Sequence, residues 1–387
     1  MKRTLIITFA LLGLGSSLCP TSAQTVNAQP NNLSLQLEVK RAIDRGTAYL
    51  VKTQDDGGWW SDEAYPAVTS LATRSLLAKP GKPSPTEKIA IDKGLSYIRA
   101  SAKRDGGIYR TGGLQNYNTA VSLTTLAFLA DPQDDKIILK ARNFIAQGQQ
   151  DYGESGDADT PLDGGIGYGN SYTHSDMSNT LLALESLYHS EYITKDQPAV
   201  NVKRLNWEAA ISFLQSCQNL PSHNKEPWAS ADEANKGGFV YFPGDSKAGE
   251  MKLPSGRVAL RSYGSISYAG LLSFIYADLS KDDERVVAVK TWLAQNYTLE
   301  ENPGMGPQGL FYYYHTMAKA LTMAQIDRLG TADGKQHNWR EELSKKLINL
   351  QREDGRWEND NGRWWEKEAA LTSAYVLLAL ETLYPKL

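Results

Sequence analysis

A few histidine and carboxylate side chains are the ones best suited to chemistry. His315 ends a run of aromatic residues in FYYYHT (311–316), and an imidazole can bind a metal or exchange a proton near neutral pH. Asp176 opens the stretch DMSNT, and a buried carboxyl group can hold or deliver a proton. If the protein is an enzyme, we expect Asp176 to handle a proton and His315 to accept one or orient the ligand. The predicted catalytic residues are Asp176, His315, His174 and Glu366.

Six copies of one sequence unit position these residues. Each copy starts with a helical segment of mixed polarity, as in RGTAYLVKTQDDGGWW (45–60), and then breaks at glycine. A second segment follows and is apolar on nearly all sides, so it must be buried all round. Six outer helices around six inner ones satisfy this, which predicts an all-α fold, a closed (α/α)6 toroid. The predicted inner helices are 67–78, 119–130, 176–188, 263–277, 314–324 and 370–384.

Polar residues recur where the predicted inner helices begin. Serine and threonine at such positions cap helices through their hydroxyl groups, whereas histidine is not a favoured cap, and this singles out His315. The aligned residues are Thr69, Val121, Ser178, Ser265, His315 and Thr372.

Aromatic residues gather at the same end of the predicted barrel. A cavity lined by rings with few polar groups suits a hydrophobic ligand and favours cations over the ring faces, and the same rings can stack on sugars. The predicted ligand-binding residues are Tyr65, Tyr117, Asn118, Asn179, Tyr263, Tyr312, Tyr313 and Trp365.

Two of the repeats carry a recognisable motif. RGTAYLVKTQDDGGW (45–59) has the order of the QW motif of triterpene cyclases, and LINLQREDGRW (347–357) repeats its second half. Over residues 41–387 the chain resembles the terpenoid cyclase and protein prenyltransferase superfamily, which implies a six-fold α/α barrel whose cavity opens near the N-termini of the inner helices. We expect the motif residues to be structural, with Trp59 and Trp357 covering the adjoining turns. The glutamines expected to bind carbonyl groups at helix ends are Gln54, Gln149, Gln218 and Gln351.

The zinc site that the resemblance implies is incomplete in this sequence. Farnesyltransferase-like β-subunits bind zinc through an Asp-x-Cys at one inner helix and the histidine of a Tyr-His-Thr at the next. Residues 314–316 match the second element, but Tyr263-Gly264-Ser265 replaces the first. One ligand, His315, is left where zinc needs three or four. We therefore expect no intrinsic zinc and no cofactor.

The cyclase acid is also replaced. Squalene–hopene-type cyclases protonate their substrate from the middle aspartate of a D-x-D-D-T motif. The matching residues 176–180 read Asp-Met-Ser-Asn-Thr, so Ser178 stands at the position of the proton donor. A serine hydroxyl cannot protonate an alkene, so standard cyclisation is not expected unless another acid reaches the cavity.

An acidic loop precedes the third inner helix. The stretch GDADTPLDGG (156–165) gathers Asp157, Asp159 and Asp163. It loosely resembles a calcium-binding loop, but it lacks the glycine and the closing glutamate of an EF-hand. We interpret it as a solvated acidic turn and leave calcium binding open.

The N-terminal residues predict export. Residues 1–23 begin with Lys2 and Arg3, continue as an apolar stretch and end in small residues, which is the order of a secretory signal peptide. Removal of this segment changes the formal net charge from -3 to -5. A lipoprotein anchor at Cys19 is less favoured, because the bulky Leu18 precedes it. The expected location is the periplasm or the exterior.

The remaining chain predicts one domain. Residues 24–40 are rich in glutamine and asparagine and read as a flexible lead-in, and residues 41–387 as a single toroid of six repeats. No later segment is apolar enough to predict a transmembrane span. The mild acidity without a basic run argues against a nucleic-acid partner.

Three functions fit these observations. The first is binding of a hydrophobic terpenoid- or lipid-like ligand, with any reaction resembling that of a terpene cyclase or prenyltransferase. The second is a polysaccharide lyase or hydrolase, because α/α toroids also serve such enzymes and export suits them. The third is a non-catalytic platform for a protein partner, with insertions after Gly164 and Gly237 as its surface.

Overall fold

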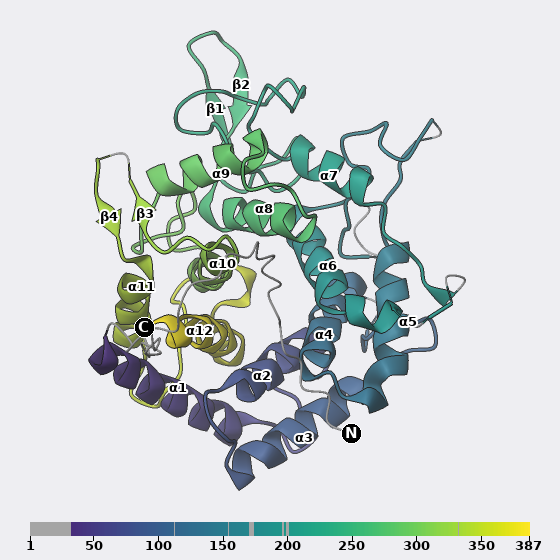
Figure 1. Cartoon of the computed structure of the whole chain (residues 1–387), viewed down its shortest axis with the longest axis vertical. Coiled ribbons are helices and arrows are strands. Elements are labelled where there is room, and N and C mark those ends of the chain that lie inside the picture. The colour runs from purple at the N-terminus through teal and green to yellow at the C-terminus, as the bar shows by residue number, and fades with distance from the viewer. Residues whose placement is uncertain are drawn as a thin grey trace, which may run out of the picture.

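Twelve α-helices in the described residues form two concentric rings, as Figure 1 shows. The computed structural model describes residues 32–111, 113–153, 155–169, 174–195, 197–198, 201–331 and 333–387. The outer helices are α1 (Leu33–Thr53), α3 (Pro85–Ala100), α5 (Asp135–Gln147), α7 (Trp207–Ser216), α9 (Glu284–Gln295) and α11 (Trp339–Asn349). The inner helices are α2 (Pro66–Ala78), α4 (Gln115–Leu129), α6 (Met177–His189), α8 (Gly264–Tyr276), α10 (Leu310–Met323) and α12 (Ala369–Leu383).

The prediction of an all-α toroid is confirmed. Each inner helix contacts the next, and α12 contacts both α10 and α2, so the inner ring is closed. The inner helices are buried along nearly their whole surface, whereas an outer helix such as α5 buries one face through Ile138, Ala141 and Ile145. Two small antiparallel hairpins project from the rings: β1 (Glu250–Lys252) with β2 (Val258–Leu260), and β3 (Leu329–Gly330) with β4 (Gln336–His337).

The first outer helix begins earlier than predicted. α1 starts at Leu33, and the side chain of Asn32 caps it by accepting a hydrogen bond from the backbone N–H of Leu35 at 3.1 Å. Residues 33–40 therefore belong to this helix and not to a flexible lead-in, because Leu35 and Val39 already pack on the core. Outside the described residues lie the predicted signal peptide 1–23 with Cys19 and residues 24–31. No helix in the described part of the chain is long and apolar enough to cross a membrane.

A repeated joint fastens outer helices to their successors. The side chain of Gln54 donates through Nε2 to the carbonyl of Gly58 at 3.0 Å and to that of Ala90 in α3 at 2.9 Å. One amide thus ties its own glycine turn to the following repeat. The same pair of bonds is made by Gln149, Gln218 and Gln351.

The last of these joints closes the outer ring. Gln351 donates to the carbonyl of Ala42 in α1 at 2.9 Å. Gly355 has a φ of +95°, and a Cβ atom added to it would stand 2.5 Å from the carbonyl oxygen of Arg45. The sixth repeat therefore contacts the first as other repeats contact their successors. The same close approach to the next outer helix occurs at Gly58, Gly106, Gly164 and Gly237.

Trp59 covers the first turn, as predicted, because a Cβ atom added to Gly57 would overlap its indole, while the adjacent Trp60 packs into the core. Trp60 is buried, and its Nε1 donates to the carbonyl of Leu50 at 2.8 Å. Trp357 makes the equivalent bond to the carbonyl of Leu347 at 2.8 Å, and its ring packs against Gly46 of α1. Trp59 is half-buried and packs on another ring nearer the surface. The sequence has two adjacent tryptophans here, and only packing decides which of them turns inward.

Hydroxyl groups join the glycine turns to the inner helices and define a common position. The Oγ1 atom of Thr69 accepts the N–H of Trp60 at 3.1 Å. The bonded residues are 9 apart in the first repeat and 28 apart in the fourth, so insertions hide the correspondence. The predicted alignment is therefore wrong beyond Thr69. The residues that make the equivalent bonds are Thr119, Thr180, Ser267 and Ser373, in place of Val121, Ser178, Ser265 and Thr372.

Substituting the closing glycine tests the importance of this joint. We expect Gly355→Ala to lower the free energy of unfolding by ~1–3 kcal/mol more than Gly81→Ala, because its Cβ would overlap α1. Gly81 is the matched control, since its φ is +101° and no atom lies within 4 Å of an added Cβ. Denaturant unfolding of both variants measures the difference. Equal losses in the two variants would show that the close contact is unimportant.

Candidate functional site

The toroid encloses a cavity of about 700 Å³ at the N-terminal end of the inner helices. All six inner helices contribute to its wall, and the loops that precede them form its mouth. Aromatic and aliphatic side chains make up most of the lining. The predicted site residues that line the cavity are Tyr65, Tyr117, His174, Tyr263, Tyr312, His315, Trp365 and Glu366.

Strained aromatic residues stand at the mouth. Trp364 and Trp365 have φ values of +53° and +65°, in the left-handed region that bulky residues rarely adopt. The ring of Trp365 packs edge-on against Tyr65 with centroids 4.7 Å apart. Trp364 lies under the guanidinium group of Arg363 and against Gly309, where an added Cβ would stand 2.8 Å from the indole. Both rings keep over 40% of their surface exposed, so they are available to a ligand at the mouth.

His315 lies on the wall of the cavity, as predicted. It is 5% exposed and stacks on the ring of Tyr375 with centroids 5.4 Å apart. Burial lowers the pKa of His315 well below its usual value, so the imidazole is neutral. Its Nδ1 atom is buried and has no hydrogen-bond partner in the described part of the chain. The neutral ring therefore presents a polar group to the cavity, while Nδ1 itself is covered by protein atoms.

Three charged residues at the floor of the cavity were not predicted. Glu185 accepts a hydrogen bond from Lys319 Nζ at 2.6 Å and one from Arg74 at 3.4 Å. Burial alone would raise the pKa of Glu185, but the two cations hold it well below its usual range, so the group is ionised. The sequence did contain a signal, since each residue is an isolated charge within an otherwise apolar inner helix.

Asp176 caps a helix and does not line the cavity. It is fully buried, and its Oδ1 accepts the N–H of Asn179 at 3.0 Å, which caps α6. Its Oδ2 accepts a hydrogen bond from the side-chain amide of Asn179 at 2.7 Å. Asp176 and Asn179 were both predicted site residues, and neither contributes to the cavity wall. Burial raises the pKa of Asp176 to about 6, although the bonds from Asn179 oppose that shift.

Glu366 lines the cavity but serves the start of a neighbouring helix. Its Oε1 accepts the backbone N–H of Tyr312 in α10 at 2.8 Å, and its Oε2 accepts a hydrogen bond from Asn359 at 2.7 Å. Burial raises the pKa of Glu366 above its usual value despite these bonds. Asn118 does the same for α2, where its Oδ1 accepts the N–H of Ala67 at 3.0 Å. The carboxylate and the amide are thus used to cap helices.

Tyr313 points away from the cavity. Its ring is buried, and its hydroxyl donates to the carbonyl of Thr298 at 2.8 Å. Tyr314 beside it donates to the carbonyl of Leu299 at 2.6 Å. In FYYYHT, therefore, Tyr312 and His315 face the ligand space, while Tyr313 and Tyr314 anchor α10 to the preceding loop.

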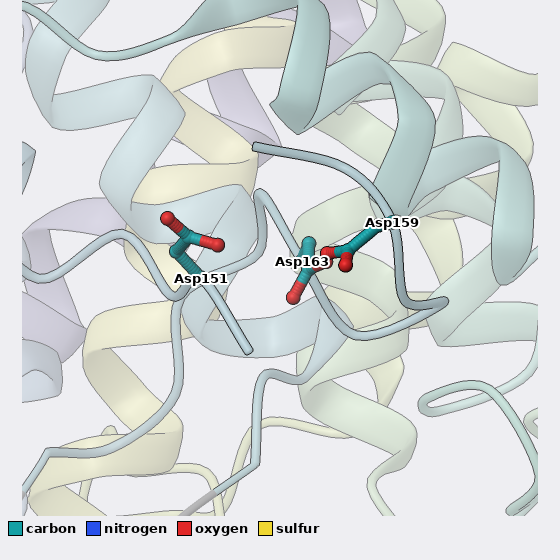
Figure 2. A group of neighbouring side chains, drawn as sticks. All are labelled: Asp151, Asp159 and Asp163. Carbon is teal, nitrogen blue, oxygen red and sulfur yellow. The ribbon is translucent and has the colours of Figure 1, made fainter. Parts of the chain in front are cut away.

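A cluster of carboxylate side chains at the acidic loop takes no part in the cavity wall. Figure 2 draws the three side chains of this cluster. Its members are Asp151, Asp159 and Asp163, each with an oxygen atom within 4.8 Å of the others. Asp163 is buried and accepts backbone N–H groups from Tyr152 and Thr160, both at 2.6 Å. Of the predicted residues, Asp157 is not in this group and instead accepts a hydrogen bond from Asn206. The bonds to Asp163 hold the loop in shape. The predicted solvated turn therefore holds for the exposed Asp159 but not for Asp163, which is buried because it binds the backbone of the loop.

The buried carboxyl of Asp176 predicts a pH dependence of stability. Because the pKa is raised to about 6 in the folded state, its stabilising contribution is complete below pH ~4 and is lost as pH rises through about 6. We expect Asp176→Asn to become more stable relative to wild type between pH 4 and 7.5, by up to about 3 kcal/mol. Asparagine keeps the cap, and the unpartnered Oδ1 of Asn179 can accept its amide. Denaturant titrations at both pH values measure this, and a pH-independent difference would contradict it.

No protein-family model and no curated protein sequence matches the chain. Solved structures do resemble it. A variant of the type II terpene cyclase MstE from Scytonema, in complex with its product merosterolic acid A, is 13% identical with a TM-score of 0.56 over 91% of this chain and 99% of that one. A possible member of the GH105 family from Klebsiella pneumoniae is 13% identical with a TM-score of 0.52 over 96% and 100%. At these identities the likeness shows the fold alone: the chain is an α/α toroid.

Proposed function

We propose that the toroid binds a hydrophobic, terpenoid- or lipid-like molecule in its central cavity. The observation that carries this proposal is the cavity itself, about 700 Å³ with walls of aromatic and aliphatic side chains. This volume falls within the range of small-molecule sites, and such lining residues favour apolar ligands. The few polar groups, His315 among them, would orient the ligand.

The structural neighbours support this choice. MstE structures contain merosterolic acid A as product and geranylgeranyl dihydroxybenzoate as substrate, so the same fold encloses prenylated molecules in those proteins. Among the described residues of the cavity wall, neither carboxyl side chain is free to act as the acid that cyclisation needs. Glu185 is ionised by its ion pairs, and Glu366 is occupied by the start of α10. We therefore propose ligand binding without proton-initiated cyclisation.

A second candidate is the processing of an oligosaccharide. The exposed rings of Trp364 and Trp365 at the mouth can stack on sugars, and GH105-type proteins share the fold. Most glycoside hydrolases use a pair of carboxyl groups on either side of the scissile bond. Asp176 lies outside the cavity wall and Glu366 caps a helix, so the described residues favour the hydrophobic ligand.

We also propose that the protein is exported by cleavage of residues 1–23. N-terminal sequencing and mass measurement of the protein from its host test this, with Gln24 as the expected first residue. A lipid-modified Cys19 at the N-terminus would support a membrane anchor instead. A full-length chain retained with Met1 would refute export.

Blocking the cavity tests ligand binding. Ser178 lies on the cavity wall, and we expect Ser178→Trp to weaken binding of the neutral hydrophobic probe N-phenyl-1-naphthylamine by roughly tenfold or more. Ser96→Trp is the matched control, because Ser96 is exposed on the outer helix α3. Fluorescence titration measures binding, and mass spectrometry of extracts from the native protein identifies the retained molecule. Equal binding by both variants, or a retained oligosaccharide, would overturn the proposal.

A further inference from the structure

The floor of the cavity is built by charged residues from alternate inner helices. Arg74 comes from α2, Glu185 from α6 and Lys319 from α10, and all three line the cavity. Each is the ninth or tenth residue of its helix, so the charged level lies roughly 12 Å below the helix N-termini at the mouth. The aromatic and aliphatic wall lies between the two levels.

The charges at this floor do not balance. Glu185 supplies one negative charge against the two positive charges of Arg74 and Lys319. Burial favours the neutral forms of three further ionisable groups nearby, because it shifts their pKa values downwards for His315 and His189 and upwards for Glu381. Burial also lowers the pKa of Lys319, and the ion pair with Glu185 opposes that shift and favours the charged ammonium. The floor therefore carries an excess of one positive charge in a partly enclosed, low-dielectric space, where an unmatched charge is costly.

Both cations keep hydrogen-bond donors for a ligand. In the described part of the chain, Glu185 is the hydrogen-bond partner of both Lys319 and Arg74, with one bond from each. An ammonium group has three donors and a guanidinium group five, so most of them remain unused. The side chains of Lys319 and Arg74 are only 12% and 17% exposed. Because they line the cavity, their unused donors can reach a ligand there.

His315 is a further polar residue beside Lys319. It stands one helical turn above Lys319 on the same face of α10, and it is 5% exposed. Its buried Nδ1 has no hydrogen-bond partner among the described residues although the side chain lines the cavity. Protein atoms cover Nδ1 itself, so the part of the ring that lines the cavity is what adds a polar group beside Lys319.

We propose that this floor binds the carboxylate of an amphipathic acid, which enters the cavity with its charged group first and leaves its apolar body against the aromatic wall. This inference rests on the proposed function. A single excess positive charge matches a monoanion, and carboxylate oxygens accept hydrogen bonds from guanidinium, ammonium and imidazole donors alike. The distance from floor to mouth sets a minimum ligand length of roughly 12 Å.

A matched series of ligands tests the proposal. Dodecanoic acid, dodecanol and dodecylamine share one apolar body and differ in the head group, and each displaces N-phenyl-1-naphthylamine from the wild-type protein if the cavity binds it. We expect the acid to bind roughly tenfold tighter than the alcohol and the amine to bind weakest. If none of the three displaces the probe, the proposed function fails. If the alcohol binds as tightly as the acid, only the carboxylate site fails.

Two lysines distinguish the floor from the mouth. Lys319→Met removes the excess charge with a side chain of similar length, and we expect the acid and the alcohol then to bind equally. Lys247→Met is the matched control, because Lys247 also lines the cavity but lies at the mouth beside Tyr241. Glu185→Gln raises the excess charge and should increase the preference for the acid, which keeps the test valid if Lys319→Met does not fold. Loss of the preference in Lys247→Met alone would place the head group at the mouth and overturn the proposal.

Discussion

The structure depends on inner helices that are apolar on every side. Helices such as α8 and α12 cannot be stable at a water interface, so each needs an outer helix behind it and an inner neighbour on both flanks. An open array would leave the first and last inner helices exposed along one flank. Contact between α12 and α2 removes that exposure. The joint between Gln351, Gly355 and α1 does the same for the outer ring.

Closure of the ring creates a central cavity, and the side chains that face it from the inner helices determine its chemistry. Most lining side chains are aromatic or aliphatic, and Arg74, Glu185 and Lys319 form a charged level at the floor. Burying an ion pair costs desolvation that its attraction often does not recover, so such a group is weak evidence for stability. Its position on the cavity floor, where two cations face one carboxylate, is the basis of the proposed carboxylate site.

Capping between repeats explains why the obvious acids are not free for catalysis. The inner helices begin at the mouth, and their N–H groups need acceptors there. Glu366 serves α10, Asp176 serves its own helix α6, and Asn302 accepts the N–H of Ser265 at the start of α8. The N–H groups at these helix N-termini are thus the reason that acidic and amide side chains lie at the mouth. A carboxylate near the cavity therefore has a structural use before any chemical one.

The sequence by itself determined the repeats, the two helix types and the closed toroid, because periodicity and the all-round apolar character of the inner helices leave few other arrangements. It also placed His315, Tyr117 and Tyr312 at the cavity. Tertiary structure alone decided the alignment of the repeats, since the two residues of the equivalent hydrogen bond lie 9 positions apart in the first repeat and 28 apart in the fourth. It also decided that Trp60 turns inward, that Tyr313 turns away, and that three isolated charges meet. These features depend on contacts between helices that are far apart in the chain, and such contacts leave no local pattern in the sequence.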